Sequence, residues 1–97
     1  MVLGRVDGTV VATRKDEKLQ GVKLLVIRVV DLDRKPTGNA FVAVDAVGAG
    51  VGEIVLCAQG SSSRLTSVTE NRPVDAVIVG IVDTLELEGK VAYQKGN

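Results

Sequence analysis

The sequence contains no histidine and only one cysteine, Cys57. Histidine is the most frequent general base and metal ligand in proteins, so its absence removes the commonest catalytic and zinc-binding designs. A single cysteine excludes an intramolecular disulfide and, without histidine, a Cys–His nucleophilic pair. Because Cys57 stands within an apolar run, we expect it to be a small buried hydrophobic residue and not a reactive thiol.

Aromatic residues and net charge are equally scarce. Phe41 and Tyr93 are the only aromatic residues, and 12 basic side chains balance 12 acidic ones. Sites for single-stranded nucleic acid combine stacking aromatics with a basic groove, and anionic membranes attract positive charge. The composition therefore argues against nucleic acid and membrane as partners. A net charge of zero also removes the repulsion that keeps subunits apart, which permits association.

Long apolar runs are missing as well. The longest, around positions 76–82, has about seven residues, whereas a transmembrane helix needs roughly 20. In the first residues, MVLGRVDG, the acidic Asp7 interrupts the apolar pattern, which is not typical of a signal peptide. We therefore expect a cytoplasmic protein.

The residues that are present indicate one small β-rich domain, residues 1–97. Hydrophobic residues make up 45% of the chain, which is enough for a core. Alternating or apolar runs separated by turn residues predict strands and one short helix. The expected strands are residues 2–13, 22–30, 40–47, 53–59, 74–83 and 91–94, and the expected short helix lies near residues 61–69. The pattern predicts a mostly β fold, a small five- to six-stranded antiparallel OB-like barrel in which the last strand closes the sheet.

Two of the predicted strands, 22–30 and 74–83, are apolar on both faces. In the first, Leu25, Ile27 and Val29 line one face, and further aliphatic residues line the other. A strand at the surface of a small monomer cannot bury both faces. We therefore expect the second face to be covered by another layer of the barrel or by a neighbouring subunit. The charged segment 14–21 is expected to be a solvated loop.

The motifs that would carry chemistry do not fit. The segment 48–52 reads GAGVG and joins two strands, whereas a dinucleotide-binding loop requires GxGxxG followed by a helix. The acidic turn at 31–39 does not fit a calcium loop, because Lys35 and Pro36 occupy positions that need a ligand and a glycine. We predict a protein that is not an enzyme, with no metal site and no cofactor.

The middle of the chain carries short motifs in a fixed order. They are Val44-Asp45 followed by Gly48-Ala49-Gly50, then Gly60-Ser61-Ser62-Ser63-Arg64, then the run from Pro73 to Asp83. In their order and spacing these motifs resemble those of the EutN/CcmL family of bacterial microcompartment vertex proteins. The resemblance covers nearly the whole chain. One departure is Ser63, where members of that family often carry alanine.

The resemblance implies a β-barrel subunit that assembles into a homopentamer. In that family, rings of five close the vertices of a polyhedral shell in the bacterial cytoplasm, and hexameric shell proteins tile its facets. It implies a structural role without catalysis and without cofactors. The alternative is an oligomeric OB-like module that binds nucleic acid or a small ligand.

The same resemblance points to two short segments as candidates for a subunit interface or a pore. The candidate residues are Gly48, Ala49, Gly50, Ser61, Ser62, Ser63, Arg64, Asp45 and Asp83. Glycines at 48 and 50 allow a positive φ or a close backbone approach, and Ser61 or Ser62 suits the N-cap of the expected helix. Either segment could equally be a plain connection.

For Arg64 two interpretations remain open. One is a salt bridge to an aspartate of the next subunit, with Asp45, Asp75 and Asp83 as the candidates. The other is a solvated guanidinium or an ion pair within the subunit.

Overall fold

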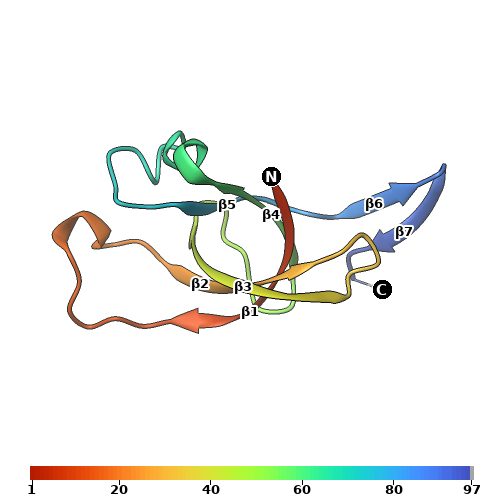
Figure 1. Cartoon of the computed structure of the whole chain (residues 1–97), viewed down its shortest axis with the longest axis horizontal. Helices are drawn as coiled ribbons and strands as arrows, with labels where there is room; N and C mark the ends of the chain where they lie inside the picture. The colour runs from red at the N-terminus through yellow and green to blue at the C-terminus, as the bar shows by residue number, and fades with distance from the viewer. Residues whose placement is uncertain (97) are drawn as a thin grey trace.

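The computed structural model describes residues 1–96 and contains a closed five-stranded barrel (Figure 1). The barrel strands are β1 (Val2–Val10), β2 (Leu24–Val30), β3 (Pro36–Asp45), β4 (Ile54–Gln59) and β5 (Ala76–Ile81). Their order around the barrel is β1-β2-β3-β5-β4. Two short 3₁₀ helices, η1 (Glu17–Leu19) and η2 (Gly60–Arg64), lie in the connections. The predicted small, mostly β, OB-like barrel is confirmed.

One strand pairing differs from the all-antiparallel prediction. β3 and β5 run parallel and pair at only two positions, Val44 with Val77 and Asp45 with Ile78. The chain leaves β3, runs back along β4 and crosses one end of the barrel through η2 before it enters β5. This crossover returns β5 in the direction of β3, as parallel neighbours require.

The end of the chain also differs from the prediction. The expected last strand does not close the barrel sheet; β6 (Thr84–Leu87) and β7 (Lys90–Gln94) form a separate two-stranded sheet. The turn between them has positive φ at Glu88 (52°) and Gly89 (78°), the geometry of a tight hairpin turn. Because β1 pairs with β4 and β3 pairs with β5, the barrel is already closed when the chain leaves it at Asp83.

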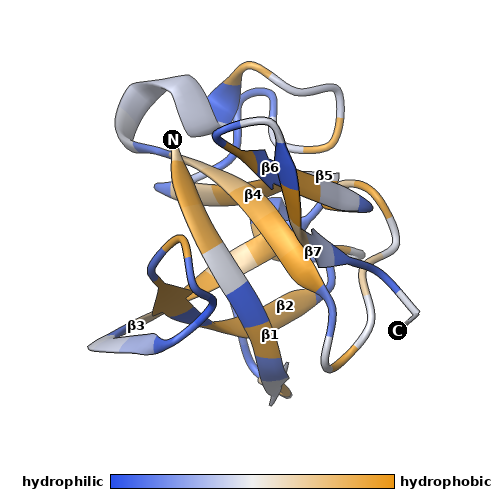
Figure 2. Cartoon of the chain, turned by 90° about the vertical axis from the view of Figure 1, so that its right-hand side faces the viewer, coloured by the Kyte–Doolittle hydropathy of each residue, from blue (hydrophilic) through white to orange (hydrophobic). Residues whose placement is uncertain are grey.

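Small aliphatic side chains fill the barrel. Its most buried members include Val6, Leu25, Ile27, Val55 and Ile78, each with at most 1% of its surface exposed. Cys57 is also fully buried, and burial raises the pKa of its thiol to about 11, as expected for an inert cysteine. Figure 2 shows the hydrophobic β4 beside β1, with the polar residues mostly in the connections.

Close strand contact explains one glycine inside β1. A Cβ atom at Gly4 would collide with the side chain of Ile27 and would lie 3.3 Å from the carbonyl oxygen of Arg28. Gly4 pairs with Val29 on β2 and with Val55 on β4. A side chain at position 4 would therefore displace a core residue.

A second apolar cluster covers the outside of the barrel where β3 meets β5. Its buried members are Val44, Ala58, Val74 and Val77, and Leu19 and Leu24 pack against them. The two-sided pattern of β5 therefore has a partner within the same subunit. The segment 14–21 is mostly exposed, as expected, but it contains η1 and contributes the half-buried Leu19 to this cluster.

An irregularity in β2 separates Val29 from Leu25 and Ile27, which the alternation places on one face. The register with β3 shifts between Arg28 and Val30. Val30 is consequently buried with 4% exposure, whereas Val29, which the alternation places inward, is only half-buried. A bulge of this kind cannot be read from period-two alternation.

The molecule is elongated, with extents of 45 × 23 × 23 Å. The β6–β7 hairpin projects from one end of the barrel, and η1 with the start of β2 lies at the other (Figure 1). Within residues 1–96 no helix has the length and apolar character that crossing a membrane would require.

Candidate functional site

The first candidate segment is the connection from β3 to β4, residues 46–53, which we name the glycine loop. Asp45 at the end of β3 begins it: its Oδ1 atom accepts hydrogen bonds from the backbone N–H groups of Val47 and Gly48, both at 3.0 Å. Gly48 then has a φ of 82°, a left-handed conformation that favours glycine. The predicted conformational role of Gly48 is confirmed, and Asp45 forms the turn that leads to it.

The far side of the glycine loop is fixed by a carboxylate. Glu53 Oε1 accepts a hydrogen bond from the Gly50 N–H at 2.5 Å, and Glu53 Oε2 lies 2.5 Å from the Lys95 Nζ atom. The Lys95 ammonium and, next, the Gly50 N–H lower the pKa of Glu53. Gly50 itself has no positive φ; in this loop the second glycine that does is Gly52, at 91°.

Burial divides the glycine loop. Ala49 has only 1% of its surface exposed and belongs to the barrel core. Val51, two residues later, is 66% exposed at the tip of the loop. The loop therefore anchors itself through Ala49 and presents an apolar side chain outward.

The second candidate segment, η2 together with residues 65–75, we name the serine loop. The predicted N-cap role of Ser61 or Ser62 is wrong, because the cap position falls on Gln59 and no side chain caps it. Ser62 Oγ instead donates to the Gln59 carbonyl at 2.8 Å. The short helix expected near residues 61–69 is present as a five-residue 3₁₀ helix that begins at Gly60 and is followed by turns.

Buried hydroxyl groups hold the serine loop together. Ser63 Oγ lies 2.6 Å from the Gly60 carbonyl oxygen and 2.9 Å from that of Val74, and Ser63 is fully buried. Thr69, also fully buried, donates its hydroxyl to the Ser63 carbonyl at 2.6 Å. These bonds tie the start of the loop to its return into β5.

Arg64 points into the same network. Its Nη1 atom donates to the Val74 carbonyl at 3.2 Å, and within residues 1–96 it forms no ion pair. Neighbouring Leu65 is 84% exposed, and the surface hollow around both residues also includes Thr66 and Glu70. The guanidinium thus keeps donors that its single backbone bond does not use.

The two loops lie at opposite ends of β4. The glycine loop leads into Ile54 at the start of that strand, and η2 follows Gln59 at its end. The structure therefore does not bring Gly48–Gly50 together with Ser61–Arg64 within one subunit. Asp83, where the chain leaves β5, lies on the side of the glycine loop: the preceding Val82 donates its N–H to the Ile54 carbonyl at 2.8 Å. The Asp83 carbonyl oxygen accepts the N–H of Lys95 at 2.8 Å, and Lys95 also pairs with Glu53 of that loop.

One charged cluster was not predicted as a unit. Asp7 on β1 forms ion pairs with Arg5 at 2.7 Å and with Arg28 on β2 at 3.0 Å. The Arg5 and then the Arg28 hydrogen bond lower the pKa of Asp7. The alternation in β1 places Arg5 and Asp7 on one face, but the contribution of Arg28 depends on the register between β1 and β2.

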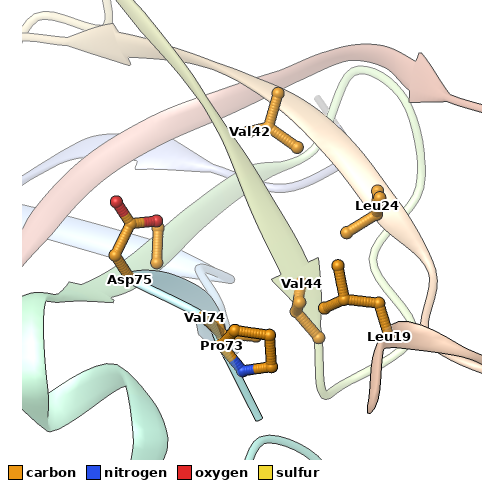
Figure 3. A pocket seen from close by; sticks show the side chains of 8 residues that line it. Leu19, Leu24, Val42, Val44, Pro73, Val74 and Asp75 are labelled. Atoms are coloured by element: carbon orange, nitrogen blue, oxygen red, sulfur yellow. The ribbon is translucent and has the colours of Figure 1, made fainter. Parts of the chain in front are cut away.

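An apolar groove of about 210 Å³ lies outside the barrel at the β3–β5 junction. Figure 3 shows that its lining comes from distant parts of the chain. The aliphatic lining residues are Leu19, Leu24, Val42, Val44, Pro73, Val74 and Ala76. The aliphatic part of the lining suits an apolar side chain of a protein partner, and Asp75 contributes the carboxylate of the groove. Within residues 1–96 no cluster of three metal-ligating side chains occurs.

Comparisons with known proteins give a consistent result. The family model described as "Ethanolamine utilisation protein EutN/carboxysome" matches residues 1–83. The carboxysome shell vertex protein CcmL of Gloeobacter violaceus is 43% identical over 98% of this chain and 95% of its own length. The solved structure of Gloeobacter violaceus CcmL is similar with a TM-score of 0.95 at 42% identity, over 100% of both chains. The GrpN pentameric microcompartment shell protein from Rhodospirillum rubrum is similar with a TM-score of 0.82 at 49% identity, over 90% of this chain and 99% of its own.

Proposed function

The chain belongs to the EutN/CcmL family, and from this membership we propose that it is a structural shell protein, a homopentamer that caps the vertices of a polyhedral bacterial microcompartment. In this proposal the ring sits in the shell, in the bacterial cytoplasm, beside hexameric shell proteins that form the facets. It catalyses no reaction and holds no cofactor.

The observation that carries the proposal is the likeness to the pentameric shell protein GrpN, at 49% identity with a TM-score of 0.82. At that identity, subunits of the same fold commonly keep the same mode of assembly. The likeness to the vertex protein CcmL over 98% of this chain supports the corner position in particular.

The physical requirements of a shell corner agree with this role. A hexagonal layer closes into a polyhedron only where rings of five replace rings of six, and a ring of identical subunits needs a head-to-tail interface that closes. Such an interface joins two different surfaces of the subunit. The exposed apolar residues of this chain lie on several separate segments: Val11 follows β1, Val51 lies in the glycine loop, Leu65 in the serine loop and Val91 in β7.

The charged side chains of the two loops serve local structure in this proposal. Asp45 accepts bonds from its own turn, and Glu53 joins Gly50 to Lys95. Each carboxylate thereby shapes a connection of the barrel. This use of acidic groups is what a scaffold subunit needs.

We place the subunit interface or pore at the two loops and at Asp83. The residues are Asp45, Gly48, Ala49, Gly50, Ser61, Ser62, Ser63, Arg64 and Asp83. Since the loops lie at opposite ends of β4, a head-to-tail ring brings the glycine loop of one subunit toward the serine loop of the next. Ala49 and Ser63 support these loops from within, because both are buried in the subunit. Arg64 keeps free guanidinium donors for an aspartate of the neighbour.

Native mass spectrometry tests the proposal. We expect a mass five times that of the 10.1 kDa subunit. A monomer or dimer would contradict the vertex role, and a hexamer would keep the family but contradict the corner position. The Arg64→Ala variant then tests the proposed ion pair: we expect fewer intact rings than in the wild type, and unchanged rings would remove Arg64 from the interface.

A further inference from the structure

The β6–β7 hairpin has little support from its own subunit. The family match ends at residue 83, immediately before β6 begins at Thr84. The hairpin is a sheet of its own, and two-stranded hairpins alone are marginally stable in water. Beyond the chain linkage, Lys95 pairs with Glu53, and the Arg34 guanidinium lies 5.9 Å from the Tyr93 ring centre. A second contact surface would stabilise this projection.

The hairpin carries apolar side chains suited to such a contact. Leu85, Leu87 and Tyr93 are only half-buried, and Val91 is 56% exposed. Leu85 stands opposite Tyr93 in the register. In Figure 2, where this end of the molecule faces the viewer, hydrophobic and hydrophilic stretches alternate along the hairpin. Residues 84–97 contain two acidic and two basic side chains, so no net charge opposes docking onto an apolar surface.

The groove at the β3–β5 junction is the matching surface. Its lining includes Leu19 of η1 and Leu24 at the start of β2. Figure 1 shows these two segments at the end of the molecule opposite to the hairpin, so the hairpin of the same subunit does not reach this part of the groove. Val42, which lines it, is 45% exposed. Val42 comes two residues before Val44, the first of the two β3 residues that pair with β5. At Val42 the edge of β3 that faces β5 is therefore not paired with that strand. The groove therefore offers an apolar floor and a strand edge together.

We propose that the β6–β7 hairpin of each subunit straps onto the next copy of the chain by packing into that copy's β3–β5 groove. The inference rests on the proposed ring, because a head-to-tail ring places different surfaces of neighbouring copies against each other. A projection at one end and an apolar groove at the other form such a pair. Since the family match stops before the hairpin, the strap secures a ring that the matched region forms.

Cysteine cross-linking in the full-length protein tests the strap. The double variant Val91→Cys with Val42→Cys places one thiol on the hairpin and one in the groove, both at exposed positions. The native Cys57 is buried and its thiol is inert, so it adds no background. A cross-link within one chain by a short bis-maleimide would leave a monomer on a denaturing gel, so only links between copies of the chain give larger species. We expect a ladder of covalent oligomers up to five chains on a denaturing gel, and each single variant should stay monomeric there.

The outcomes separate the strap from the ring. A native mass of five chains without a cross-linked ladder would overturn the strap and leave the proposed ring intact. A wild-type mass other than five would overturn the ring itself. A second measurement compares Leu87→Lys with Thr84→Lys, which adds the same charge to β6 at an exposed position. We expect Leu87→Lys to raise the concentration at which the ring half-dissociates by about tenfold or more, and equal values for the two variants would also overturn the strap.

Discussion

The two loops at the ends of β4 are both rich in small residues, yet the fold holds them by opposite means. The glycine loop depends on backbone conformation, with left-handed φ values at Gly48 and Gly52, and its polar contacts lie near solvent. The serine loop depends on side chains, because the fully buried Ser63 and Thr69 supply its hydrogen bonds. Small residues therefore allow left-handed backbone conformations in the glycine loop, whereas in the serine loop they form buried hydrogen bonds.

The difference determines which changes each loop tolerates. In the glycine loop a substitution matters where φ is positive and matters little where the side chain meets solvent. In the serine loop the loss of one hydroxyl leaves carbonyl groups without a partner inside the protein. For a ring, the serine loop is thus the stiffer surface, and the glycine loop is the one whose shape depends on a few dihedral angles.

The largest effect is expected from the buried hydroxyls. Thr69→Val keeps the volume but removes the donor to the Ser63 carbonyl, and Ser63→Ala removes the bonds to Gly60 and Val74. Each change should lower the free energy of unfolding by about 1–3 kcal/mol, because buried carbonyls lose their partner. Urea unfolding at one fixed subunit concentration measures this. The control is Ser61→Ala in the same loop, at an exposed position where we expect a change below about 0.5 kcal/mol.

The comparison would fail if Ser63→Ala were as mild as Ser61→Ala. Such a result would mean that Arg64, which also donates to the Val74 carbonyl, compensates for the lost hydroxyl. The double variant Ser63→Ala with Arg64→Ala would then show a loss greater than the sum of the single ones.

An intermediate effect is expected in the glycine loop. Gly48→Ala forces a side chain into a φ of 82° and should cost about 1–2 kcal/mol of folding free energy. Gly50→Ala is the matched control, because Gly50 has no positive φ and its new Cβ would lie 3.4 Å from Glu53 Oε1. We expect Gly50→Ala to change stability by less than about 1 kcal/mol. Equal losses in the same unfolding experiment would show that crowding, and not φ, governs this loop.

Local pattern was enough to predict the barrel, and contacts between distant segments account for what it missed. Alternation located the five barrel strands, and the positive φ of Gly48 followed from residue type. The parallel β3–β5 pair and the separate hairpin depend on which strand edges of the barrel are still unpaired when the later segments of the chain reach it. No local sequence pattern encodes this. The structural role of the Ser63 hydroxyl was not predicted, because one of its partners, the Val74 carbonyl, lies 11 residues away along the chain.

The smallest effect is expected at the exposed ion pair that joins the glycine loop to the end of the hairpin. Lys95 and the Gly50 N–H lower the pKa of Glu53, so ionised Glu53 stabilises the fold at pH values above its unfolded-state pKa. That contribution is lost as the pH falls through the lowered folded-state pKa. The stability difference between wild type and Glu53→Gln should thus be largest near neutral pH, decrease in acid, and be smaller at high salt. In a Lys95→Gln background only the Gly50 hydrogen bond remains and the pH-dependent part should shrink; a difference that did not vary with pH would show that the carboxylate is not what holds this loop.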